Sequence, residues 1–131
     1  MQTKLGFLGP KGTYAEQAAN ALAQLEGIED PDLVPCNALR SVVENLIMGL
    51  TDFAVIPVEN SVEGGVTESL DALWANPKIW IRRALVLPIR HALLGSGKLE
   101  EISEVLSHPQ ALAQCNEWLA THLPNALSLP T

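Results

Sequence analysis

Cysteine is scarce in this chain of 131 residues. Its two cysteines, Cys36 and Cys115, lie far apart, with no CxxC pair and no nearby pair of histidines. That spacing excludes a disulfide framework and the usual zinc-binding patterns, and it predicts reduced, structural thiols. We therefore expect no metal site and no cofactor.

Positive charge is also scarce. Eight Lys and Arg residues stand against 15 Asp and Glu residues, which gives a net charge of −7. The basic residues are scattered, and Arg82 with Arg83 is their densest cluster. Such a chain repels polyanions, so we predict no nucleic-acid partner. An anionic small molecule would have to be held by local donors, such as backbone N–H groups at a helix start or one placed cation.

Long apolar runs are missing as well. Hydrophobic residues make up 47% of the chain, yet no run approaches the roughly 18 uninterrupted apolar residues of a membrane helix. The N-terminal sequence MQTKLGFLGPKGTY lacks the basic start and apolar core of a signal or transit peptide. We therefore expect a soluble, cytoplasmic protein without a membrane partner, long enough to bury a core.

Strand and helix patterns alternate along the first part of the chain. Three apolar or alternating stretches predict strands, at residues 3–9, 33–36 and 52–58. Three amphipathic stretches predict helices, at residues 13–26, 38–49 and 66–74. This alternation is typical of a mostly parallel sheet with helices on both faces, so the predicted class is α/β.

The later part of the chain predicts a connection followed by more strand and helix. Residues 79–94 form a long β-rich run interrupted by Pro88, which fits a bent crossing between two lobes better than one strand. A short strand is expected at the end of residues 100–108, then a helix over 109–123 and another strand near 127–131. The tryptophans are expected in the core or between lobes: Trp74, Trp80 and Trp118.

The segment VENSVEGGV, residues 58–66, is the strongest candidate for a functional site. It follows an apolar strand, and ligands in α/β proteins bind beyond the carboxyl ends of strands. Glu59 can accept or donate a proton, Asn60 can do both in hydrogen bonds, and Ser61 adds a hydroxyl. The structural alternative is that Asn60 and Ser61 form an Asx-type turn and cap the next helix, with Glu59 in solvent.

Two other segments lie at strand-to-helix junctions. In GFLGPKGTY, Thr13 either caps a helix, with Glu16 in capping-box spacing, or helps to bind a carboxylate at the helix N-terminus. In LSHPQALAQC, His108 and Gln110 follow a strand end. A lone histidine at a turn is more often a hydrogen-bonded structural group than a catalyst, so both interpretations of His108 stay open.

These segments, in this order, resemble the prephenate dehydratase family. The resemblance rests on GPKGTYAEQAA, VIPVENSVEGGVTESLDAL, LPIRHALL and SHPQALAQCNEWL, which cover most of the chain. It implies a lyase that converts prephenate to phenylpyruvate with loss of water and carbon dioxide in L-phenylalanine biosynthesis. It also implies a two-lobed fold similar to type 2 periplasmic binding proteins. We expect the first lobe over residues 1–78 and the crossing segment with an incomplete second lobe over 79–131.

The resemblance also assigns residues. The family's cleft glutamate and asparagine fall on Glu59 and Asn60, with Ser61 beside them, and the glutamine of its S-H-P-Q motif falls on Gln110. The predicted substrate-binding set is Thr13, Glu59, Asn60, Ser61, His108 and Gln110. The family's proposed proton donor is a threonine in a T-R-F motif that this sequence does not contain, so no catalytic residue is assigned. We also expect these residues to lack the family's regulatory ACT domain and to be inactive alone.

Two alternatives stay open. A non-catalytic binding or sensing module on the same two-lobed scaffold would hold a ligand with these residues without transforming it. Arogenate in place of prephenate would differ by an amino group, which the sequence does not discriminate. Sheet edges without partners favour association, so we also expect a homo-oligomer.

Overall fold

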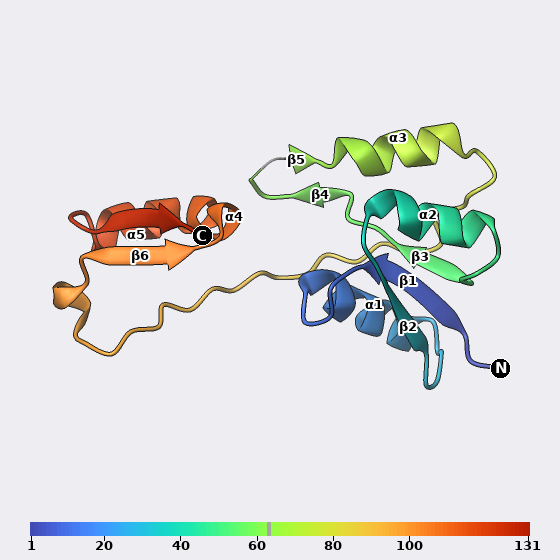
Figure 1. Cartoon of the computed structure of the whole chain (residues 1–131), viewed down its shortest axis with the longest axis horizontal. Coiled ribbons are helices and arrows are strands. Elements are labelled where there is room, and N and C mark those ends of the chain that lie inside the picture. The colour runs from blue at the N-terminus through green and yellow to red at the C-terminus, as the bar shows by residue number, and fades with distance from the viewer. Residues whose placement is uncertain (63) are drawn as a thin grey trace. The chain divides into compact units, whose positions relative to one another are not determined.

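The computed structural model describes residues 1–62 and 64–131. The chain folds as two compact units, Met1–Leu87 and Pro88–Thr131, whose elements are shown in Figure 1. Residues 79–87, which the sequence assigns to the crossing segment, group with the first unit. Strands and helices alternate through most of the chain, and the main sheets are parallel, so the predicted α/β class is confirmed.

The first unit is built on a three-stranded parallel sheet with the strand order β2-β1-β3. Its strands are β1 (Lys4–Leu8), β2 (Asp32–Cys36) and β3 (Phe53–Val55). The connections between them contain the helices α1 (Tyr14–Leu25) and α2 (Leu39–Ile47). All five elements were predicted from periodicity, and only their ends differ from the prediction.

Side-chain alternation along β1 gives the two helices separate faces of the sheet. Leu5 and Phe7 are 2% and 0% exposed and pack in one cluster with Ala19 and Ala23 of α1. A Cβ placed on the intervening Gly6 would lie 3.7 Å from the Val42 side chain of α2. Because successive positions of a strand face opposite ways, this one strand carries both packing surfaces. Figure 1 shows α1 and α2 on either side of β1.

A short antiparallel hairpin follows β3. Its strands are β4 (Glu59–Asn60) and β5 (Gly64–Gly65), and α3 (Thr67–Ala75) comes next. Gly64 has a φ of +76°, a left-handed conformation that glycine adopts without steric cost. The sequence predicts a loop here. The structure shows in addition that the two ends of this loop pair as short strands.

The connection between the two units contains no regular structure. Residues 76–98 hold no helix or strand, which agrees with the expectation of a connection, and not a single strand, over residues 79–94. Within the described chain, no backbone–backbone hydrogen bond involves residues 80–97. The residue types in this run pack well on the surface of a sheet and therefore favour strands. A strand forms only when it pairs with another strand, and this run has no such partner among the described residues.

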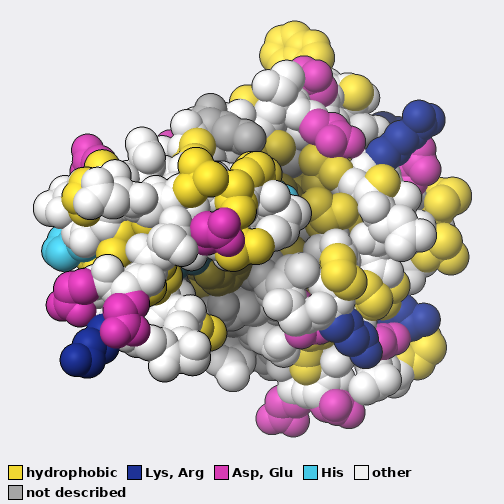
Figure 2. Space-filling view, turned by 60° about the vertical axis from the view of Figure 1, so that its left-hand side comes forward, with side chains coloured by type: hydrophobic (Ala, Val, Ile, Leu, Met, Phe, Trp, Pro, Cys, Tyr) yellow, Lys and Arg dark blue, Asp and Glu magenta, His cyan; other side chains and the backbone are white. Residues whose placement is uncertain are grey.

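The tryptophan positions also differ from the sequence interpretation. Trp74 and Trp80 are 90% and 88% exposed, and Trp118 is 43% exposed. The prediction that these tryptophans lie in the core is therefore wrong for all three. The alternative, that they lie between the two lobes, stays a prediction. Figure 2 shows large hydrophobic side chains at the surface on the side that it draws. The core of the first unit consists instead of smaller aliphatic residues packed around Phe7.

The second unit pairs two strands in parallel. They are β6 (Glu104–Ser107) and β7 (Leu127–Pro130), preceded by the 3₁₀ helix η1 (Leu99–Glu101). Between the strands lie α4 (Pro109–Gln114) and α5 (Asn116–His122). The helix predicted over 109–123 begins at Pro109 as expected, but it is not continuous. It breaks at Cys115, where ψ is 5° instead of a helical value and where cysteine and asparagine, both weak helix formers, follow each other.

Candidate functional site

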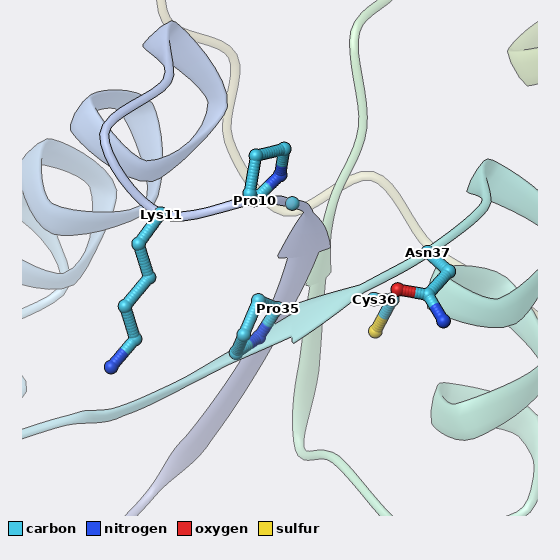
Figure 3. A pocket seen from close by; sticks show the side chains of 6 residues that line it. Pro10, Lys11, Pro35, Cys36 and Asn37 are labelled. Carbon is cyan, nitrogen blue, oxygen red and sulfur yellow. The ribbon is translucent and has the colours of Figure 1, made fainter.

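A hollow of about 340 Å³ lies at the carboxyl ends of β1 and β2. It is lined by Gly9, Pro10, Lys11, Pro35, Cys36 and Asn37. Ligands of α/β proteins bind at this kind of edge, beyond the carboxyl ends of parallel strands. Figure 3 shows Lys11 and Asn37 extending in different directions from the two loops. The hollow thus offers one cation and one amide, on separate loops.

The sequence interpretation did not assign Lys11 or Asn37 to a site. Asn37 follows β2 directly, and Lys11 lies in the loop between β1 and α1. Ligands of α/β proteins bind beyond the carboxyl ends of strands, and this rule singled out residues 58–66. The same rule, applied to the residues that follow β1 and β2, could have found Lys11 and Asn37. Residues 33–36 were predicted as a strand, but the residue that follows them was not considered as a ligand-binding group.

Thr13 is the N-cap of α1. Its Oγ1 accepts a hydrogen bond from the backbone N–H of Glu16 at 3.4 Å and donates one to the carbonyl oxygen of Pro10 at 3.0 Å. Glu16 reaches back in turn, and its Oε1 accepts from the backbone N–H of Gly12 at 3.1 Å. The predicted capping role is therefore confirmed, and a role in binding a carboxylate stays a prediction.

Replacing Thr13 with alanine should lower the free energy of unfolding by about 1 kcal/mol, because the first turn of α1 loses its side-chain acceptor. Thr13→Ser, which keeps the hydroxyl, is the matched control and should stay close to the parent chain. Thermal unfolding followed by circular dichroism measures both. Equal melting temperatures for the two variants would show that the cap contributes nothing.

Asn60 occupies the hairpin and makes the turn that the structural alternative describes. Its Oδ1 accepts a hydrogen bond from the backbone N–H of Val62 at 3.0 Å, as in an Asx-type turn. The second half of that alternative is wrong, because the N-cap of α3 is Val66 and no side chain caps the helix. Glu59 and Ser61 are exposed on either side of Asn60. Their side chains can therefore be reached by a ligand.

His108 and Gln110 lie in the second unit. His108 is the N-cap of α4, and its Nδ1 accepts a hydrogen bond from the backbone N–H of Gln110 at 3.1 Å. The structural interpretation of His108 is thereby confirmed, and a contact with substrate stays a prediction. Both side chains are exposed. Convergence of Gln110 with Glu59 on one cleft also stays a prediction, since these residues belong to different units.

The described residues contain no group of three or more His, Cys, Asp or Glu side chains that could hold a metal ion. Both cysteines are free, as predicted, and the Sγ of Cys36 accepts a hydrogen bond from Asn45 Nδ2 at 3.5 Å. No helix in the part of the chain that the structure describes is long and apolar enough to cross a membrane.

Comparison with known proteins finds similarity along nearly the whole chain. A family model described as "Prephenate dehydratase" matches residues 5–131. The prephenate dehydratase of Lactococcus lactis is 36% identical over 123 residues, which are 94% of this chain and 42% of that protein. The arogenate dehydratase/prephenate dehydratase 1 of Arabidopsis thaliana, named as chloroplastic, is 37% identical over 116 residues, 87% of this chain and 28% of that protein.

A solved structure gives the same result for the fold. The prephenate dehydratase of Arthrobacter aurescens, crystallised in complex with L-Phe, superimposes with a TM-score of 0.72 and is 37% identical. The match covers 98% of this chain and 42% of that one. The chain therefore spans less than half the length of these relatives.

Proposed function

Because the chain belongs to the prephenate dehydratase family, we propose that it serves the conversion of prephenate to phenylpyruvate, with loss of water and carbon dioxide, in L-phenylalanine biosynthesis. The observation that carries this proposal is the family match over residues 5–131. The chain corresponds to 42% of the Lactococcus lactis relative. We therefore propose that these residues supply one part of a substrate site, to which the rest of the relatives' length also contributes.

The chemistry of the reaction sets what such a site must contain. Prephenate carries two carboxylates and a ring hydroxyl. The carboxylates have to be oriented by hydrogen-bond donors and the leaving oxygen has to receive a proton, while aromatisation of the ring drives the step. In a chain of net charge −7, a dianion depends on local donors, and the N-terminus of α1 and Lys11 are two of them.

The proposed substrate-binding groups come from both units. The first unit contributes Thr13, Glu59, Asn60 and Ser61, and the second contributes His108 and Gln110. In this proposal the units are the two lobes of a fold like that of type 2 periplasmic binding proteins. The support is positional, because every one of these residues lies in the hairpin after β3 or at the start of α1 or α4. The Asx-type bond to Val62 also holds the Asn60 side chain in one orientation.

A chimeric enzyme tests the proposal. These 131 residues would replace the matching part of the Lactococcus lactis relative, and phenylpyruvate formed from prephenate would be measured. We expect turnover by the chimera and none by the remainder of the relative alone. A chimera that folds and binds prephenate but forms no phenylpyruvate would contradict the proposal and favour the non-catalytic binding module.

In that chimera, Asn60→Ala should lower kcat/KM about 10-fold or more, the equivalent of one hydrogen bond to a charged substrate group. The matched control is Asn20→Ala on the exposed face of α1, which should leave kcat/KM unchanged. Steady-state rates and melting curves are measured on both variants. A large fall in melting temperature with unchanged kcat/KM would assign Asn60 to the turn alone.

Arogenate is the second candidate substrate. The Arabidopsis thaliana relative, 37% identical to this chain, carries both substrates in its name. Assaying the chimera with prephenate and arogenate side by side gives the ratio of the two kcat/KM values. A ratio in favour of arogenate would change the assigned substrate and leave the reaction class as it is.

A further inference from the structure

Glu26 lies where electrostatics disfavours a carboxylate. It is the C-cap residue of α1, and the last turn of that helix contains no basic residue. The C-terminal end of a helix carries partial negative charge, which attracts cations and repels anions. The Glu26 side chain is also only 15% exposed, so water solvates it incompletely. A carboxylate in this position needs positive partners from another part of the chain.

Those partners lie far away in the sequence. The Nε of Arg82 donates to Oε2 of Glu26 at 3.0 Å, and the Nε of Arg83 donates to Oε1 at 2.8 Å. Each carboxylate oxygen thus has its own guanidinium. The hydrogen bonds from Arg83 and Arg82 lower the pKa of Glu26 from its ordinary value, which favours the charged carboxylate.

Few other polar contacts hold this stretch of the chain. Residues 80–87 lie in no helix or strand, and within the described structure they take part in no backbone–backbone hydrogen bond. Arg82 and Arg83 are adjacent in the sequence. Bringing Arg82 and Arg83 onto one carboxylate therefore constrains the backbone between them as well as their side chains.

We propose that Glu26, Arg82 and Arg83 form an ion-pair clamp that holds residues 79–87 against the C-terminal end of α1. The clamp fixes the place where the chain leaves the first unit, because the second unit begins at Pro88. When the clamp opens, the connecting segment is released from α1 and the free length between the units increases. This role is independent of the reaction proposed above.

A second ion pair, on α2, shows why this clamp differs from an ordinary surface ion pair. Arg40 and Glu44 also lie within hydrogen-bonding distance, at 2.7 Å, but their side chains are 82% and 50% exposed. Such exposed pairs contribute little to stability. In the clamp, Arg82 and Arg83 are also 70% and 43% exposed, but Glu26 is only 15% exposed, has two partners, and joins segments 56 residues apart. The Arg40–Glu44 pair therefore provides a matched control in the same chain.

Limited trypsin digestion of the 131-residue chain tests the clamp, since cleavage after Arg82 and Arg83 should become faster when this segment is released from α1. Cleavage after Arg90 serves as the internal reference within each sample. Relative to that reference, Glu26→Gln should raise cleavage at both sites at least about threefold, because cleavage follows the population of the open segment. Glu44→Gln should leave the ratio unchanged. Equal ratios for Glu26→Gln and the parent chain would overturn the proposal.

A salt series on the parent chain gives a second test that requires no substitution. Raising the NaCl concentration from about 0.05 M to about 1 M shortens the screening length and should raise cleavage at Arg82 and Arg83 relative to Arg90. The same series on Glu26→Gln should show no such rise. If that variant does not fold, the parent chain alone decides, and a cleavage ratio independent of salt would refute the clamp.

Discussion

The 131 residues by themselves should form phenylpyruvate at least about 10²-fold more slowly than the chimeric enzyme, and up to about 10⁴-fold more slowly. That range is the usual contribution of one positioned general acid. The resemblance places this acid in a T-R-F motif that the sequence does not contain. The described part of the second unit also holds only two paired strands. We therefore expect a bound substrate to be less shielded from water in this chain than in the chimeric enzyme.

Three samples decide this prediction: the chain alone, the chain mixed with the separately made remainder of the Lactococcus lactis relative, and the chimera. Mixing should restore part of the activity if the two polypeptides fold around each other. Appreciable turnover by the chain alone would contradict the prediction. The chemistry would then reside on a residue already present, such as Glu59, Ser61 or His108.

Phe7→Ala should lower the free energy of unfolding of the first unit by about 3–5 kcal/mol. Phe7 is 0% exposed, and its ring packs in the cluster of Leu5, Ala19, Ala23 and Val55, so truncation leaves a cavity between the sheet and α1. For a unit of this size the melting temperature should fall by about 12 °C or more. Circular dichroism on heating measures the change.

The matched control for this cavity is Phe7→Leu, which keeps most of the side-chain volume and should cost less than about 1.5 kcal/mol. A similar loss in both variants would mean that the aromatic ring, and not the filled volume, stabilises the cluster. A loss below about 1 kcal/mol for Phe7→Ala would show that the cluster collapses around the gap, and it would contradict the assigned core.

Local patterns account for the parts of the fold that were predicted correctly. The helices α1 and α2 follow from side-chain periodicity, because each buries one face against the sheet, and the strands β1 and β2 follow from short apolar or alternating runs. The cap at Thr13 follows from residue types three positions apart. The Asx-type turn at Asn60 depends likewise on a contact two residues along the chain. Short-range geometry of this kind is encoded in the sequence itself.

The candidate site was predicted less completely than the fold. Its residues at 58–61 were found because a glycine-rich polar loop follows an apolar strand, and His108 with Gln110 because a proline opens the next helix. Asn37 was missed because nothing in its neighbours sets it apart. It contributes to the hollow only because β1 and β2 pair side by side in parallel, which brings the ends of both strands to one edge.

The sequence by itself determined the family, the α/β class and the local elements, because motifs and periodicity need no knowledge of distant contacts. Only the tertiary structure decided that residues 79–94 stay unpaired, that Trp74 and Trp80 are exposed, and that Glu26 meets two arginines. Each of these depends on which segments lie together. A β-forming run becomes a strand only beside another strand, and a half-buried carboxylate at a helix C-terminus is stabilised when distant cations reach it.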